Sequence, residues 1–155
     1  MRQTPLFDGG TSEDQQRILA LHQEWLDAQN TLDTRTARRL MTADPTAVFW
    51  NINGHQYTGI DHWCRLWDYY RTQFETIEPW RALDVKVIIR GDMAVVTAYR
   101  TARLRQIGGD QASSFVQDKP LMFRGTVVFV REGRDWKIAH GHFAHTSDGP
   151  RPGGI

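Results

Sequence analysis

The spacing of the apolar residues changes near position 80, and this change constrains the fold more than any other feature of the sequence. Before it, apart from one short hairpin, apolar residues recur every three or four positions, as in amphipathic helices. After Pro79 they alternate with polar residues, as in half-buried strands. Helices followed by a long antiparallel meander are typical of an α+β domain whose helices cover one face of the sheet.

Three helices are expected before this change. The first covers about residues 12–31, with Ser12 as its N-cap and Gln15 completing a capping box. The second covers residues 34–41 and ends before Pro45, because the residue preceding a proline disfavours helical backbone angles. The third carries a stripe at helical spacing that consists of Ile60, Trp63, Leu66, Trp67, Tyr70 and Phe74.

The strands are expected to form a short hairpin and then a meander. Residues 47–52 and 55–58 pair across a tight Asn53-Gly54 turn. Glycine turns and a polar stretch over 108–118 separate the later strands, which cover residues 83–89, 94–105, 121–131 and 136–146. Strong curvature of this antiparallel or mixed sheet around the three N-terminal helices would form a cone that encloses a pocket.

The length of 155 residues fits one domain. We expect it over residues 12–147, between a flexible N-terminal segment at 1–11 and a C-terminal tail at 148–155. The single cysteine, Cys64, cannot form an internal disulfide, and the polar start lacks the apolar run of a signal peptide. No apolar stretch approaches the roughly 18 residues of a membrane span. These features predict a soluble cytoplasmic protein without a membrane partner.

The composition narrows the class of partner. Lys and Arg number 19 against 18 Asp and Glu, a formal net charge of +1 that is too balanced for binding a phosphate backbone. A nucleic acid partner is therefore not expected. The six tryptophans, four tyrosines and seven phenylalanines are unusual, and nine of them lie between Phe49 and Trp80. Such a cluster forms either a core or the wall of an apolar pocket, and Trp67 and Phe74 fit both roles. A small aromatic molecule is the expected ligand.

The order of elements resembles the SnoaL-like branch of the nuclear transport factor 2-like superfamily over about residues 12–147. The best local match is the run 124–143, in which a threonine-bearing strand turns into Trp136 and then into a His-x-His sequence. The segment from Gly54 through Gly59 to Asp61 resembles the hairpin that precedes the family's third helix. The resemblance implies the fold and commonly a homodimer formed through the outer sheet face. It does not imply one reaction, because the fold hosts many activities.

The same strands are similar to the association domain of calmodulin-dependent kinases, which carries three pocket arginines. Arg100 falls on the first of these positions, and Val127 and Phe143 fall on the other two. Trp63 falls on the position of a pocket histidine, and Tyr70 lies seven residues further on the same helix face. The resemblance thus implies an apolar, aromatic pocket with a single guanidinium.

The histidines are the natural candidates for general acid and base, because their pKa lies near neutrality. His140 and His142 share one face of their strand. If Phe143 faces the pocket, His145 joins it and the His-x-His pair faces away, into a dimer interface; a bulge would reverse this. His22 lies on the core face of the first helix and is either a pocket residue or a core histidine.

The remaining candidates are hydrogen-bonding groups. Arg100 needs either an internal acid or an oxygen-bearing ligand, because an unpaired buried guanidinium is costly. Tyr57 and Asn51, on the hairpin wall, would supply hydrogen-bond donors in addition to that of Arg100. Lys119 either covers the pocket mouth or is a solvated loop residue. No metal site is expected, because His140 and His142 lack a third ligand at a matching spacing.

The leading hypothesis is a lyase or isomerase that acts without a cofactor on a small aromatic hydroxy compound. Dehydration and retro-aldol carbon–carbon cleavage, such as deformylation, need only a base and an oxyanion partner. His145, or the pair His140 and His142, would move the proton, while Arg100 and Tyr57 stabilise the oxyanion. The alternatives are a non-catalytic ligand-binding or assembly protein, and a polyketide cyclase or epoxide hydrolase, which would need a pocket carboxylate.

Overall fold

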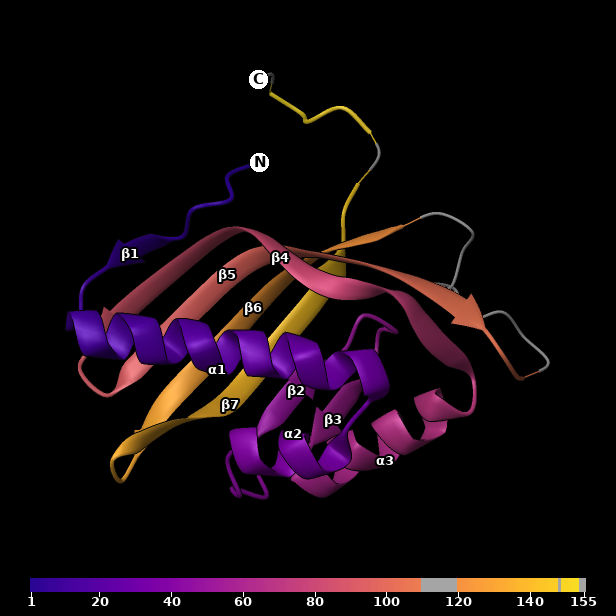
Figure 1. The fold of residues 1–155 in the computed structure, drawn as a ribbon, viewed down its shortest axis with the longest axis horizontal. Coiled ribbons are helices and arrows are strands. Elements are labelled where there is room, and N and C mark those ends of the chain that lie inside the picture. Colours follow the sequence, from indigo (N-terminus) through magenta and orange to yellow (C-terminus); the bar gives the residue numbers. More distant parts are fainter. Residues whose placement is uncertain (110–119, 148, 154–155) are drawn as a thin grey trace.

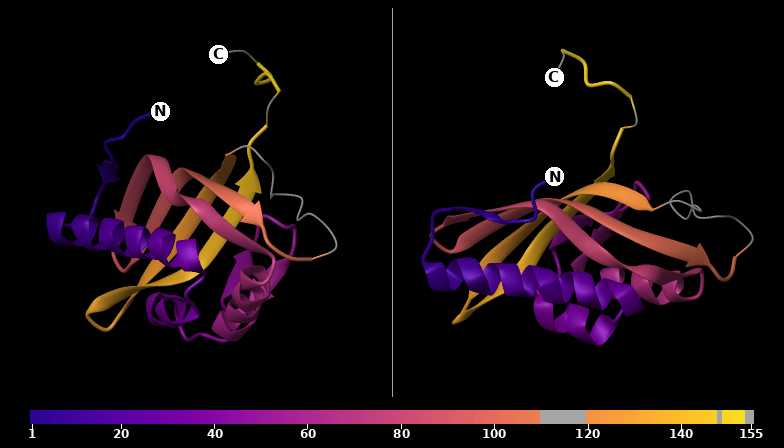
Figure 2. Two further views of the ribbon diagram at one scale, coloured as in Figure 1. Left: turned by 45° about the vertical axis from the view of Figure 1, so that its right-hand side comes forward. Right: turned by 45° about the horizontal axis from the view of Figure 1, so that its top comes forward.

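The computed structural model describes residues 1–109, 120–147 and 149–153. Three helices cover the concave face of a curved, open, mixed sheet of seven strands, so the predicted α+β cone is confirmed (Figure 1). In both views of Figure 2, the N-terminus and the described C-terminal residues 149–153 lie on the side of the sheet opposite the helices. The helices are α1 (Ser12–Thr31), α2 (Thr34–Leu40) and α3 (Gly59–Arg71).

The three helices occupy the predicted segments, but the cap of α1 differs from the expectation. Thr11, not Ser12, is the N-cap, and its side chain accepts a hydrogen bond from the backbone N–H of Asp14. The side chain of Gln15 donates to the carbonyl of Gly9 instead of closing a capping box. The N-cap is therefore a hydroxyl-bearing residue, as expected, but it lies one position earlier in the chain.

The strands follow the order β1-β4-β5-β6-β7-β2-β3 across the sheet. Neighbours pair antiparallel except β1 with β4 and β2 with β7, which are parallel. The strands are β1 (Leu6–Asp8), β2 (Val48–Trp50), β3 (Gln56–Thr58), β4 (Phe74–Arg90), β5 (Met93–Gln106), β6 (Leu121–Glu132) and β7 (Asp135–His145).

Three local expectations about the strands are corrected. The segment 1–11 contains β1, where no regular structure was expected. Phe74 does not continue α3 but starts β4, which runs through Pro79 in a region of shifted register. The turn between β2 and β3 is not a tight two-residue turn, because Trp50 pairs with Gln56 and leaves five residues in the loop. Most of the polar stretch 108–118 lies outside the described residues.

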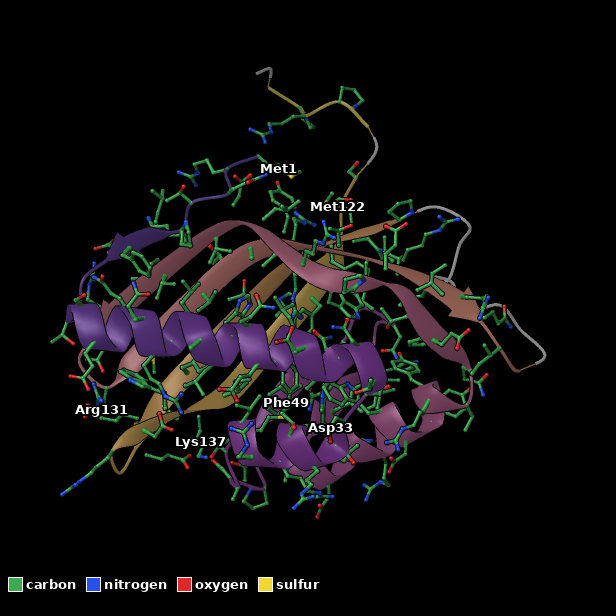
Figure 3. The ribbon with its side chains drawn as sticks, viewed as in Figure 1. Met1, Asp33, Phe49, Met122, Arg131 and Lys137 are labelled. Carbon is green, nitrogen blue, oxygen red and sulfur yellow. The ribbon has the colours of Figure 1, made fainter. Side chains whose placement is uncertain are left out.

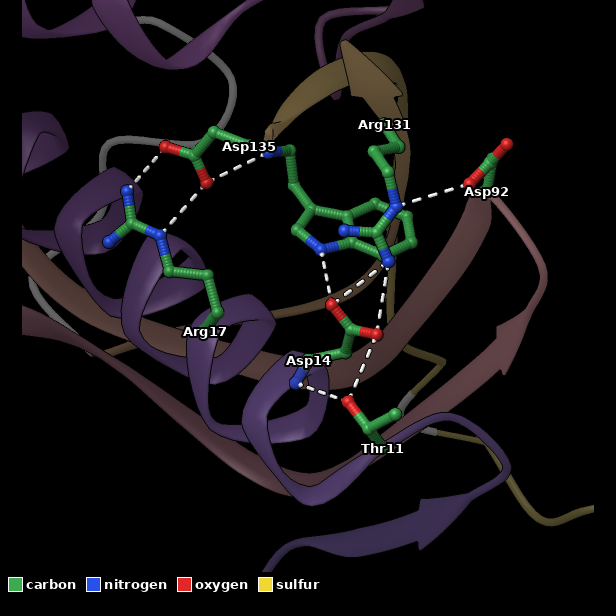
Figure 4. A network of polar contacts seen from close by, with 7 residues as sticks. Thr11, Asp14, Arg17, Asp92, Arg131 and Asp135 are labelled. Atoms are coloured by element: carbon green, nitrogen blue, oxygen red, sulfur yellow. Dashed lines mark hydrogen bonds and ion pairs between the residues drawn. The ribbon is translucent and has the colours of Figure 1, made fainter. Parts of the chain in front are cut away.

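The core fills the space between the helices and the sheet, where Phe49 is only 1% exposed (Figure 3). A polar network ties the start of α1 to the β6–β7 hairpin (Figure 4). Asp14 accepts hydrogen bonds from the guanidinium of Arg131 at 3.0 Å and from the indole of Trp136 at 3.1 Å. Arg17 donates to Asp135 with two nitrogens, at 2.9 and 2.6 Å. None of the described helices is both long and apolar enough to cross a membrane.

Candidate functional site

A cavity lies between α1, α3 and the concave face of the sheet. Its empty volume is about 480 Å³, including the part that opens to solvent. The cavity is narrow and suits a small ligand. Its wall consists of Gln29, Leu32, Asn51, Ile52, Trp63, Trp67, Tyr70, Phe74, Trp80, Arg100, Leu104, Phe123 and Phe143.

Two elements supply most of the aromatic wall. Trp63, Trp67 and Tyr70 lie at helical spacing on the buried face of α3. Phe143 of β7 faces them across the cavity, with its ring centroid 6.3 Å from that of Trp63. The amphipathic pattern of the third helix thus builds a wall of rings because the helix packs over the open end of the cone.

Arg100 is the one charged residue of the described wall, and it is 1% exposed. Its Nη2 donates to the side-chain oxygen of Gln29 at 2.6 Å, while its Nε has no hydrogen-bond partner. Its Cζ lies 4.9 Å from the ring centroid of Phe143 and 6.0 Å from that of Trp80, within the range of cation–π contacts. It forms no ion pair with any acid in the described part of the chain. Burial lowers the pKa of Arg100 to about 9.

A glycine makes room for this side chain. Gly125 of β6 pairs with Phe143 on β7 and with Ala98 on β5, two residues before Arg100. A Cβ added at Gly125 would lie 2.8 Å from Cδ of Arg100 and 3.3 Å from a ring carbon of Phe143. The missing side chain therefore lets the guanidinium lie across β6, against the ring of Phe143.

The other polar groups form a network beside the cavity. The side-chain amides of Asn51 and Asn53 each donate to the hydroxyl oxygen of Tyr70 at 2.9 Å. Asn53 also donates to the hydroxyl of Tyr57 at 2.8 Å. Burial raises the pKa of Tyr70 well above its usual value, so this phenol stays protonated. Tyr57 packs edge-on against Trp63 and lies behind the wall of the cavity.

His22 is buried behind the wall, with 2% of its surface exposed. Burial, together with the nearby charge of Arg100, lowers the pKa of His22 to about 3. The imidazole is therefore neutral at physiological pH. Of the six histidines, all of which the structure describes, it is the one that is fully buried.

The orientation of the C-terminal histidines is decided by an irregularity in β7. His140 pairs with Val128 and Ile138 with Phe129, so Ala139 is an extra residue in the strand. In a regular strand, Ile138 and Phe143 would point to opposite faces, because one has an even and the other an odd number. The bulge lets both face the core. The consequence for the histidines is that neither member of the His-x-His pair lines the cavity.

The structure places the three histidines as follows. His140 and His142 lie on the outer face, where their rings stand edge-on to Trp50 at 5.2 and 5.1 Å. His140 Nδ1 is also within 2.6 Å of the carbonyl oxygen of Val48. His145 lies on the same face of β7 as Phe143 but is exposed at the end of the strand, with its ring centroid 6.0 Å from that of Phe123.

Of the other predicted site residues, Asn51, Trp63, Trp67, Tyr70, Arg100 and Phe143 come together around the cavity. Val127 is buried in β6 outside the wall. Lys119 lies outside the described residues. Within the described ranges, no group of three potential metal ligands comes together.

Sequence reasoning did not assign Gln29 to the site. Its place on the buried side of the first helix, in line with His22 and Trp25, was the available signal. Phe123 and Leu104 were missed because alternating apolar strand residues look the same whether they face a core or a cavity. Trp80 had been noted only as part of the aromatic cluster.

Comparison with known proteins identifies the family. Residues 18–146 match the model of the SnoaL-like domain. The chain belongs to the SnoaL-like family. No curated protein matches the sequence of this SnoaL-like protein.

Several solved structures share its fold. A nuclear transport factor 2-like superfamily protein from Salmonella enterica has a TM-score of 0.78 at 15% identity, over 94% of this chain and 100% of that one. A ketosteroid isomerase-like protein from Erwinia carotovora has a TM-score of 0.71 at 15% identity, over 88% and 99%. A candidate dehydratase of the same superfamily from Streptomyces avermitilis has a TM-score of 0.68 at 19% identity, over 88% and 99%. At these identities the likeness of the SnoaL-like chain shows the fold alone.

Proposed function

We propose that the chain is a lyase or isomerase that acts on a small aromatic hydroxy compound by proton transfer, without a cofactor. The observation that carries this proposal is the guanidinium of Arg100, buried in a wall of aromatic rings without an acidic partner in the described residues. Such a charge in a water-poor site stabilises an oxyanion that develops during dehydration or retro-aldol cleavage. The names of two structural neighbours, a dehydratase candidate and a ketosteroid isomerase-like protein, agree with this class of chemistry.

Proton transfer is assigned to the groups on the Arg100 side of the wall. His22 is neutral and buried behind the wall near Arg100, and we propose that it takes up the proton there; burial, the larger cause of its low pKa, opposes this protonation, and an oxyanion that offsets the charge of Arg100 favours it. Tyr70 lines the cavity and holds its proton. His145 is the alternative base, because its ring contacts Phe123 of the wall. His140 and His142 lie on the outer face and are not assigned a catalytic role.

A panel of aromatic hydroxy compounds, followed by ultraviolet absorbance, tests this proposal. Arg100→Met should lower turnover about 100-fold or more, the range typical of losing an oxyanion donor. His22→Ala should lower it by about 100-fold or more. His142→Ala is the matched control and should leave turnover within a few-fold. Parent-like turnover in both Arg100→Met and His22→Ala would refute the mechanism, and a large loss in His145→Ala alone would move the base to that residue.

One observation favours a second candidate, a protein that binds the ligand without transforming it. The described wall of the cavity contains no histidine and no carboxylate. The same observation leaves a polyketide cyclase or epoxide hydrolase without the carboxylate it would need. Ligand recovered unchanged after long incubation with the protein, despite measurable binding, would support the binding role.

A further inference from the structure

Among the residues that the structure describes, three buried side-chain nitrogens have no hydrogen-bond partner, and all three are donors. They are Nε1 of Trp25, Nε1 of Trp63 and Nε of Arg100. Buried donors in folded proteins are almost always paired, so each exception calls for an explanation. Trp63 and Arg100 line the cavity, whereas Trp25 does not. Two of the three donors therefore belong to residues of the cavity wall and lack an acceptor in the described protein.

The charge of the cavity also indicates a ligand that supplies an acceptor. Other arginines of the described chain lie beside acids, for example Arg17 beside Asp135 and Arg131 beside Asp14. Arg100 is more deeply buried than either, yet its one hydrogen-bond partner is the neutral amide of Gln29. The described wall therefore holds one positive charge and no negative one. A ligand with one negative charge would neutralise it.

The residues that carry the two donors both pack against one ring. Phe143 packs under the guanidinium of Arg100, with 4.9 Å from Cζ to the ring centroid, and faces Trp63 at 6.3 Å between centroids. We infer that an acceptor group at the edge of Phe143, between these two residues, accepts from both N–H groups. A carboxylate has two acceptor oxygens and one charge, which matches two donors and one guanidinium. A phosphate dianion would bring a second charge with no second cation in the described wall.

We propose that the cavity binds an aromatic monocarboxylate, whose carboxylate accepts hydrogen bonds from Arg100 and Trp63 while its ring lies among Trp67, Phe123 and Phe143. This inference names the ligand class for the site of the proposed function, and it rests on that proposal only for the location. A phenol does not meet the requirement, because it is neutral at pH 7. The narrow cavity limits the aromatic part to a small one.

Two compounds that differ in one ring substituent, a carboxylate in one and a neutral hydroxymethyl group in the other, provide the test. 4-Hydroxybenzoate and 4-hydroxybenzyl alcohol have the same ring and hydroxyl, and both can be titrated by calorimetry at pH 7 in low-chloride buffer. The carboxylate should bind about 10- to 100-fold more tightly, the range expected for one charge-assisted buried contact. Equal affinities, or no binding of the carboxylate at millimolar concentration, would overturn the proposal.

Variants then locate the preference. Arg100→Met should abolish the preference for the carboxylate without lowering the affinity for the alcohol. Arg100→Lys, which keeps the charge, should retain part of this preference. Trp63→Phe removes the indole N–H and should lower the affinity for the carboxylate several-fold. Trp25→Phe removes an equally buried indole N–H that does not line the cavity, and it is the matched control. In the parent protein, the carboxylate should shift the ¹⁵N–¹H signal of the Trp63 indole; a preference that survives Arg100→Met would refute the assignment.

Failure of this inference and failure of the proposed function give different results. Tight carboxylate binding without turnover of any compound would support the proposed ligand class and refute the proposed enzymatic activity. Turnover of neutral hydroxy compounds, with no preference for the carboxylate, would support the enzymatic activity and refute the ligand class.

Discussion

Replacing Arg100 by methionine should stabilise the ligand-free protein, although it should also abolish carboxylate binding. Burial lowers the pKa of Arg100 from 12.5 to about 9, and about 1.4 kcal/mol accompanies each pKa unit. The charged side chain is thus about 5 kcal/mol less favourable in the folded protein than in the unfolded chain. Methionine has a flexible apolar side chain that can fill the same space without this cost.

Part of this gain is offset. The variant loses the hydrogen bond to Gln29, worth about 1 kcal/mol, and the cation–π contact with Phe143, worth roughly 0.5–2 kcal/mol. A net stabilisation of about 2–3.5 kcal/mol remains, in line with replacements of other buried charges. For a chain of this size, that corresponds to a rise of roughly 4–14 °C in Tm.

Urea unfolding followed by tryptophan fluorescence at pH 7 measures this difference. The advantage of the variant should also depend on pH, with a definite sign. Between pH 9 and 12.5 the unfolded chain binds the Arg100 proton and the folded protein releases it, so parent stability rises with pH. The variant's advantage is therefore complete below pH 9 and shrinks above it. A variant less stable than the parent at pH 7, or a constant difference up to pH 10.5, would refute the reasoning.

Three further predictions concern other parts of the fold. Asp14→Asn weakens the link to Arg131 and should lower the free energy of unfolding by about 1 kcal/mol, whereas unchanged urea unfolding would contradict the role given to this network. Gly125→Ala places a Cβ against the side chain of Arg100 and should cost about 1–3 kcal/mol, with weaker carboxylate binding by calorimetry; parent-like affinity would show that Arg100 had not moved. Trp50 is 45% exposed on the outer face, so if this face joins two copies of the chain, Trp50→Ser should lower the dimer fraction in sedimentation, while a monomeric parent at micromolar concentration would argue against that interface.

The sequence was sufficient for the fold because its signals are local and repeated. The helical stripe with Trp63 and Tyr70 and the alternation after Pro79 each span many residues, so single errors do not change the result. Phe74 was misplaced for the same reason: it lies four residues after Tyr70, and spacing alone cannot show that the helix has ended.

The candidate site was harder to predict, because its chemistry depends on tertiary packing. The resemblance implied that Arg100 and Phe143 face the pocket, and the structure places both residues in the wall. Whether Arg100 has an acidic partner depends on which side chains meet it across the cavity, and Gln29 approaches it from another element. The side on which His140 lies depends on one extra residue in a strand, for which the sequence carries no clear signal.

That extra residue gives the family a simple route to a different pocket. If β7 lost its bulge and kept Ala139 as a regular member of the ladder, every residue after Ala139 would exchange faces, with β6 left in place. His140 and His142 would then turn inward and Phe143 outward, replacing an apolar wall with two titratable groups beside Arg100. A shift of one residue in the register of β7 could thus convert the proposed carboxylate-binding cavity into one with its own acid and base.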